Sequence, residues 1–149
     1  MYKSVYYHII FRTKNSVPAI NEENETLLYK YIWGFIKNKK CVLFRIGGMP
    51  DHIHIFTEIH PSIAVSDFMR DLKAGSSIFL KQNHNKFPLF ECWAKSYGVF
   101  TYSEKDKYMI INYIKNQKEH HKSICFSDEY RQILNDNGVD FDEKYFLSE

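Results

Sequence analysis

The sequence predicts an α+β fold with a ferredoxin-like antiparallel sheet of about four strands. Four short runs are rich in β-branched and aromatic residues, and the segments between and after them carry apolar residues at helical spacing. Their order is strand, helix, strand, strand, helix, strand, which is the split β-α-β arrangement. We expect helices on one face of the sheet, a second face left free for a ligand or partner, and extra helices after the last strand.

The four strands are predicted from composition and from the turns between them. Residues 2–12 are rich in Val, Ile, Tyr and Phe and predict the first strand. "CVLFRI" and "HIHIFTEI" predict the next two, and the short turn "GGMPD" between them indicates antiparallel neighbours. "KSYGVFTYS" predicts the fourth strand.

The helices are predicted from apolar stripes and capping residues. An apolar stripe predicts one helix over residues 21–38, where Asn21 can act as the cap, and a second over roughly 65–82. Ser103 opens a third helix, with Asp106 at the position that suits a capping pair. That helix carries "YMIINYIKNQKEHH", and Ser127 opens a short last helix.

Bulk composition limits the class of protein and its surroundings. We expect residues 1–149 to form a single domain, and the net charge of +2 is too small to indicate nucleic-acid binding by itself. The three cysteines form no C-x-x-C pair, and the first residues lack a signal-peptide cleavage site. No apolar stretch nears the ~20 residues that a bilayer span needs. We therefore expect a reduced, cytoplasmic protein with no membrane partner.

The stretch "MPDHIHIF" places two histidines on one face of the predicted third strand. Side chains alternate along a strand, so His52 and His54 point one way and Ile53 points the other. Two neutral imidazoles can bind one divalent ion, and Asp51 could then orient one of them. The alternative is a pair of solvated residues on the wet face of the sheet.

The predicted third helix carries a polar line beside its apolar stripe. Tyr113, Gln117 and His121 are spaced at i, i+4 and i+8, so they share one helix face. Such a line suits a helix that packs beside a site, although an amphipathic helix with a polar boundary would look the same. His120 and His121 could equally serve as the polar end of a helix.

Five short motifs, taken in order, resemble one known family. They are "YYHIIFRTKN", "MPDHIHIF", "DLKAGSS", "YGVFTYS" and "YIKNQKEHH". Together they resemble the small single-tyrosine transposases of bacterial and archaeal insertion sequences, the TnpA type of the IS200-like superfamily, within the HUH endonucleases. The similarity covers most of the chain.

The resemblance implies a metal-dependent DNA transposase. Such enzymes are homodimers that cleave and rejoin single-stranded DNA at hairpin-marked element ends through a 5′-phosphotyrosine intermediate. By motif match, Tyr113 is the catalytic nucleophile, and His52, His54 and Gln117 bind a divalent metal, Mg²⁺ or Mn²⁺. Family members use composite active sites, in which the tyrosine helix of one subunit can serve the histidines of the other.

Contacts to DNA and the alternatives to catalysis remain open from sequence. Arg12, Lys14 and Lys73 are candidates for phosphate contacts, and ordinary surface charge explains them equally well. The chain could instead be a non-catalytic ferredoxin-like nucleic-acid-binding module. It could also be a domesticated, repeat-associated relative that keeps the chemistry without mobile-element activity.

Overall fold

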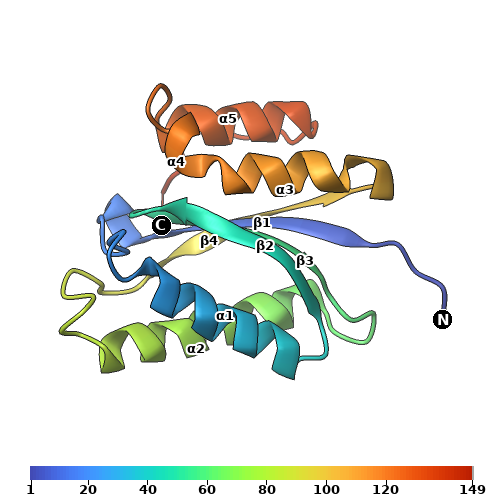
Figure 1. Ribbon diagram of the computed structural model, residues 1–149. Helices are drawn as coiled ribbons and strands as arrows, with labels where there is room; N and C mark the ends of the chain where they lie inside the picture. The colour runs from blue at the N-terminus through green and yellow to red at the C-terminus, as the bar shows by residue number, and fades with distance from the viewer. Residues whose placement is uncertain (149) are drawn as a thin grey trace.

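A computed structural model describes residues 1–148 of the chain as a sheet covered by helices on both faces (Figure 1). The strands are β1 (Tyr6–Thr13), β2 (Val42–Met49), β3 (His52–Glu58) and β4 (Trp93–Tyr102). The helices are α1 (Glu25–Asn38), α2 (Val65–Gln82), α3 (Lys107–Lys115), α4 (Gln117–His120) and α5 (Phe126–Asp136). Among these residues, no helix combines the length and apolar character that a membrane span requires.

The sheet has the strand order β2-β3-β1-β4, and all neighbouring strands are antiparallel. β1 and β3 therefore lie in the middle, and their register pairs Ile10 with His54 and Arg12 with His52. This is the ferredoxin-like α+β fold that the order of elements predicts. The first strand begins at Tyr6, later than expected, because Tyr6 pairs with Tyr102 at the end of β4 and the preceding residues have no neighbouring strand in this sheet.

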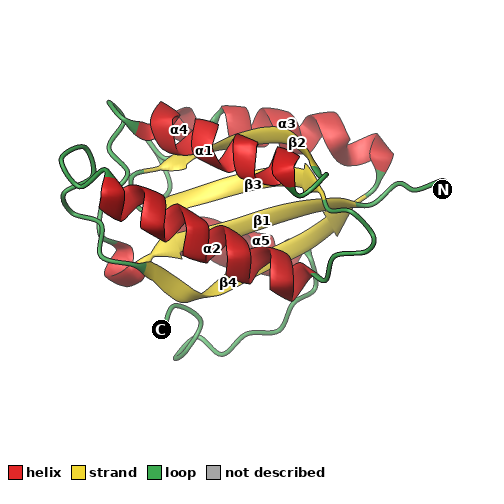
Figure 2. Cartoon of the chain, turned by 90° about the horizontal axis from the view of Figure 1, so that it is seen from below, coloured by secondary structure: helices red, strands yellow, loops and turns green. Residues whose placement is uncertain are grey.

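One face of the sheet holds the main apolar core, under α1 and α2 (Figure 2). Alternation along the strands sends Ile9 and Phe11 of β1, and Ile53 and Ile55 of β3, to this side. They pack with buried side chains of the two helices, namely Leu28, Ile32, Ile36, Phe68, Met69, Leu72 and Leu80. This side of the sheet is an apolar interior.

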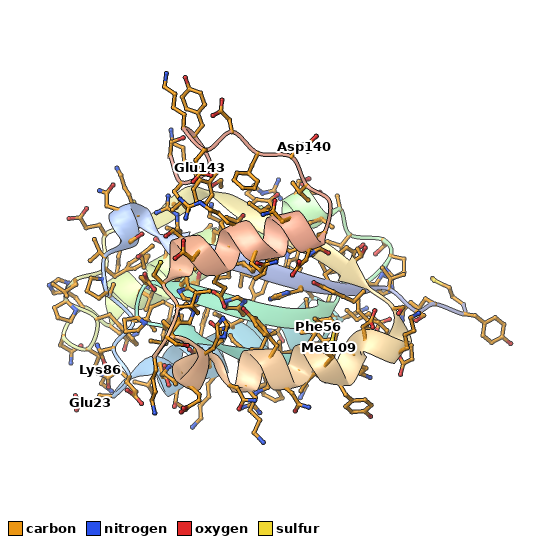
Figure 3. The ribbon with its side chains drawn as sticks, turned by 90° about the horizontal axis from the view of Figure 1, so that it is seen from above. Glu23, Phe56, Lys86, Met109, Asp140 and Glu143 are labelled. Carbon is orange, nitrogen blue, oxygen red and sulfur yellow. The ribbon has the colours of Figure 1, made fainter. Side chains whose placement is uncertain are left out.

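The opposite face is covered by α3, α4 and α5, so the expectation of a free sheet face is wrong for this chain (Figure 1). The physical reason is that this face also carries apolar side chains that need burial. Two small clusters bury them, one of Ile10, Phe100, Phe126, Ile133 and Leu134 and the other of Phe56, Ile110 and Ile114. Phe56, labelled beside α3 in Figure 3, packs with Ile110 and Ile114 of that helix.

The predicted third helix is broken at Asn116. Asn116 has φ −98° and ψ 19°, outside the helical region, and it separates α3 from the single turn of α4. Asparagine favours turns over helix interiors because its side chain competes for backbone hydrogen bonds. The second helix matches its predicted range of 65–82, and the last begins at Phe126, one residue before Ser127.

Candidate active site

His52 and His54 project from β3 into the layer between the sheet and α3–α5. Both side chains are fully buried, and both are held through Nδ1. His52 Nδ1 lies 2.8 Å from Asp51 Oδ1, and His54 Nδ1 lies 2.8 Å from Nε2 of His8 on β1. With both Nδ1 atoms occupied, the two rings present their Nε2 atoms to the space between β3 and the helices.

Tyr113 and Gln117 reach the same space from α3 and α4. Gln117 Oε1 lies 3.1 Å from His52 Nε2, and the centre of the Tyr113 ring lies 5.8 Å from that of His54. The structure thus brings all four predicted residues together within one chain. The break at Asn116 does not separate Gln117 from Tyr113, since both side chains contact Glu129 of α5.

A glycine permits this close approach of α3 to the sheet. A Cβ atom added to Gly47 of β2 would lie 2.8 Å from the backbone oxygen of Ile114 and 3.2 Å from Cγ2 of its side chain. Real Cβ contacts are essentially never as short as the first of these, so a side chain here would push α3 outwards. Gly47 therefore helps set the height of Tyr113 and Gln117 above β3.

Glu129 of α5 lies at the centre of the site. Its carboxylate is 1% exposed, and Oε1 lies 3.2 Å from His54 Nε2, 3.4 Å from His52 Nε2 and 3.0 Å from His121 Nε2. Oε2 accepts hydrogen bonds from Gln117 Nε2 at 2.7 Å and from the Tyr113 hydroxyl. One carboxylate thus links the histidine pair, the amide and the phenol.

The charges of the site follow from burial and from these contacts. Burial disfavours a charged His52, but hydrogen bonds to Asp51 and Glu129 outweigh it and raise the pKa of His52 to about 9. Burial lowers the pKa of His54 to about 4, despite the nearby carboxylate. The three contacting histidines hold the pKa of Glu129 well below its usual range against the effect of burial. At neutral pH the site therefore contains a charged His52 and a charged Glu129 beside a neutral His54.

Tyr113 is held as a neutral phenol. Partial burial and the adjacent Glu129 carboxylate raise the pKa of Tyr113 above its ordinary value. Its hydroxyl therefore keeps its proton and donates a hydrogen bond to Glu129. A phenol in this state needs a strongly polarised target, or a partner that takes its proton, before it can act as a nucleophile.

The donor atoms suit a divalent metal ion. Ligand atoms of His52, His121 and Glu129 lie within 4.8 Å of one another, and His54 Nε2 and Gln117 Oε1 contact the same group. Imidazole nitrogens combined with amide and carboxylate oxygens are donors that Mn²⁺ accepts, and Mg²⁺ shares the oxygen ligands. The residues present thus fit a metal centre.

The three basic residues proposed as DNA contacts lie away from this cluster or are buried. Arg12 is 5% exposed, and its guanidinium donates to the Leu147 carbonyl, so it does not face solvent. Lys14 is exposed in the turn after β1. Lys73 lies on α2, across the sheet from the histidines, and donates to the Lys95 carbonyl at 2.8 Å.

Two residues of the site are absent from the sequence-based prediction. His8 could have been suspected, because strand alternation puts it on the same side of β1 as Ile10, but nothing in the sequence gives the pairing of β1 with β3. Glu129 carries no comparable signal. It stands in an acidic, amphipathic helix, where a glutamate is ordinarily solvated.

Comparison with known proteins decides the family. The family model described as "Transposase IS200 like" matches residues 1–117. This chain belongs to the IS200-like transposases. The transposase for insertion sequence element IS200 of Salmonella typhimurium is 32% identical over 120 residues, which cover 78% of each protein. The ISDra2 transposase TnpA of Deinococcus radiodurans is 33% identical over 117 residues, covering 76% of this chain and 84% of that protein.

Solved structures agree with this membership. A crystal structure of a transposase candidate from Deinococcus radiodurans R1 superposes with a TM-score of 0.61 at 28% identity, covering 78% of this IS200-like transposase and 93% of that chain. A REP-associated tyrosine transposase bound to a REP hairpin gives a TM-score of 0.59 at 13% identity, covering 83% and 72%, which supports the fold alone. Family membership supports a DNA-cleaving and strand-transferring enzyme and suggests a metal cofactor.

Proposed function

We propose that this IS200-like transposase cleaves and rejoins single-stranded DNA at hairpin-marked element ends, with Tyr113 as the nucleophile. The observation that carries the proposal is the meeting of a tyrosine with two strand histidines and a glutamine in one buried site. Tyr113 and Gln117 share the Glu129 carboxylate, which also contacts both histidines. A purely structural polar cluster would not require a phenol beside two imidazoles that both present Nε2.

The proposed reaction is a phosphoryl transfer to tyrosine. Tyr113 Oη loses its proton and forms a bond to phosphorus, the bond from phosphorus to O3′ breaks, and O3′ takes a proton and leaves as a 3′-hydroxyl. The 5′-phosphate stays on Tyr113, so the energy of the broken bond is kept in the covalent link. Attack by another 3′-hydroxyl then reverses the step and joins two strands without ATP.

His52, His54 and Gln117 are the residues that would hold the metal. When bound, a divalent ion would neutralise charge that develops on the reacting phosphate. Asp51 and His8 fix the ring orientations through the two Nδ1 atoms. The helices α3–α5 exclude bulk water from the histidine pair, whose side chains are fully buried.

Formation of the covalent adduct tests the nucleophile. The protein is incubated with labelled hairpin DNA and Mn²⁺ and then separated on a denaturing gel. We expect the wild type to give a protein–DNA band and Tyr113→Phe to give none, because the phenol oxygen is the atom that bonds to phosphorus. Tyr108→Phe is the matched control, since Tyr108 lies on the same helix but is 71% exposed.

The outcome also separates catalysis from binding alone. An adduct that survives Tyr113→Phe would refute the nucleophile assignment. Binding of hairpin DNA by the wild type without any adduct, and without dependence on Mn²⁺, would favour a non-catalytic nucleic-acid-binding module. A domesticated relative would form the adduct, but its gene would lack paired hairpins on both flanks.

We also propose a homodimer as the active species. The contacts described above join Tyr113 and Gln117 to the histidines of the same chain, and the resemblance implies that another subunit can supply the tyrosine helix instead. Light scattering gives the oligomeric state. Mixing Tyr113→Phe with His54→Ala then tests exchange, because adduct formation in the mixture requires a composite site.

A further inference from the structure

Glu129 supplies the site with a charged group that comes from outside the region shared with the family model. The model match ends at residue 117, and Glu129 lies on α5, beyond that limit. α5 is anchored on the sheet by Phe126, Ile133 and Leu134, which pack against Ile10 and Phe100. This packing holds the Glu129 carboxylate at 1% exposure beside both strand histidines.

We infer that Glu129 is a fourth protein ligand of the metal held by His52, His54 and Gln117. This inference rests on the metal centre of the proposed function. Glu129 would add a carboxylate from α5 to the three neutral donors His52, His54 and Gln117. The full set of protein ligands would then carry one negative charge.

The spacing of the donor atoms supports a ligand role. Atoms that share one divalent ion, each at about 2.1 Å from it, lie roughly 3 Å from their neighbours around the ion. His52 Nε2 and Gln117 Oε1 are 3.1 Å apart. Glu129 Oε1 lies 3.4 Å from His52 Nε2 and 3.2 Å from His54 Nε2, which is the same range. Glu129 Oε1 is therefore placed as a neighbour of both histidine donors, and Gln117 Oε1 is a neighbour of His52 Nε2.

The chemistry of the groups points the same way. A carboxylate buried among imidazoles needs a cation, and a divalent ion provides one more completely than a single protonated histidine does. Carboxylate oxygen is also the ligand that Mn²⁺ and Mg²⁺ prefer. His121 Nε2 lies 3.0 Å from Oε1 and also holds the carboxylate in place.

The competing role for Glu129 is that of a plug. In that role the carboxylate would fill the place of the ion or of the phosphate, and its removal would open the site. The two roles predict opposite changes in metal affinity, so one titration separates them.

The test is isothermal titration of the metal-free full-length protein with Mn²⁺. The variant Glu129→Gln keeps the shape of the side chain and removes its charge. We expect its Kd for Mn²⁺ to rise by at least about tenfold, the lower range for loss of a group that supports a metal site. Glu119→Gln is the matched control, because Glu119 is 75% exposed on the adjacent turn α4, and its Kd should stay that of the wild type.

An affinity of Glu129→Gln equal to or higher than that of the wild type would overturn the inference, and a higher one would indicate the plug. Circular dichroism checks that each variant is folded. If Glu129→Gln does not fold, Glu129→Asp keeps the charge but withdraws it by one methylene group. Its Kd should then exceed that of the wild type, and a wild-type or lower Kd would overturn the ligand role.

The same titration distinguishes failure of this inference from failure of the metal centre itself. The double variant His52→Ala/His54→Ala removes both strand ligands while Glu129 stays. If the wild type binds Mn²⁺ no better than this double variant, the proposed metal centre is wrong. If only the double variant loses binding and Glu129→Gln does not, the centre stands and Glu129 is not a ligand.

Discussion

The two faces of the sheet differ in chemistry although they share the same strands. On the α1–α2 side, β1 and β3 contribute Ile9, Phe11, Ile53 and Ile55 to an apolar core. On the α3–α5 side, the alternate positions include His8, His52 and His54. Burial of apolar area stabilises the first face without demanding a particular partner for each atom, whereas every polar atom on the second must find one.

The polar face meets this demand through one network, with one exception. Among residues 1–148, His8 Nδ1 is the buried side-chain nitrogen or oxygen that lacks a hydrogen-bond partner. The other buried polar atoms of the site are joined through Glu129, Gln117 and Asp51. One face of the sheet is thus an apolar core and the other is a network of polar groups, so substitutions on the two faces should affect different measurements.

Replacing neighbours on β3 should give the largest contrast. Ile55→Ala removes a fully buried side chain of the core and should lower the free energy of unfolding by about 2–5 kcal/mol. It should keep the stabilisation by Mn²⁺, because the site lies on the other face. His54→Ala should lose that stabilisation, which for the wild type is about 2.7 kcal/mol at an Mn²⁺ concentration 100 times Kd.

Thermal melts with and without Mn²⁺ measure both effects. The separation of the two faces would be refuted if Ile55→Ala abolished the Mn²⁺-dependent shift in Tm, or if His54→Ala retained it.

The support that β1 gives to β3 can be tested at His8. If His54 offers its Nε2 lone pair to an ion, its Nδ1 carries the hydrogen and donates to His8 Nε2, 2.8 Å away. His8→Phe keeps a ring but removes the acceptor, so Mn²⁺ affinity should fall by about 10–100-fold. Titration calorimetry measures this. Unchanged affinity would show that His54 needs no partner at Nδ1.

Two glycines test how closely the helices approach the sheet. Gly47→Ala should push α3 outwards and destabilise the protein by about 1–3 kcal/mol, because the added Cβ would meet the Ile114 carbonyl. The control is Gly34→Ala on α1, where an added Cβ meets nothing within 4 Å. That change should stabilise the helix by about 0.4–1 kcal/mol. Urea unfolding of both variants checks the opposite signs, and equal signs would contradict the close approach at Gly47.

The sequence predicts the strand half of the site better than the helix half. Strand alternation alone puts His52 and His54 on one side, and helical spacing puts Tyr113 and Gln117 on one helix face. No local pattern states which face of the sheet a later helix covers. Only the family resemblance therefore predicts that the two histidines meet Tyr113 and Gln117. The covered second face and the break at Asn116 depend on packing between distant segments, and local spacing does not encode them.

The short connection between β2 and β3 has a consequence for how the gene can change. Pro50 and Asp51 alone join Met49 to His52, which are themselves paired across the hairpin. Because side chains alternate, a shift of β3 by one residue would exchange the two faces of the strand. The imidazoles would enter the apolar interior and Ile53 would face Tyr113. Insertion or deletion of a single codon at this turn would therefore abolish the chemistry wherever it shifted β3 by one residue, with every site residue still encoded, whereas an insertion in the loop between α2 and β4 would leave the histidine pairing intact.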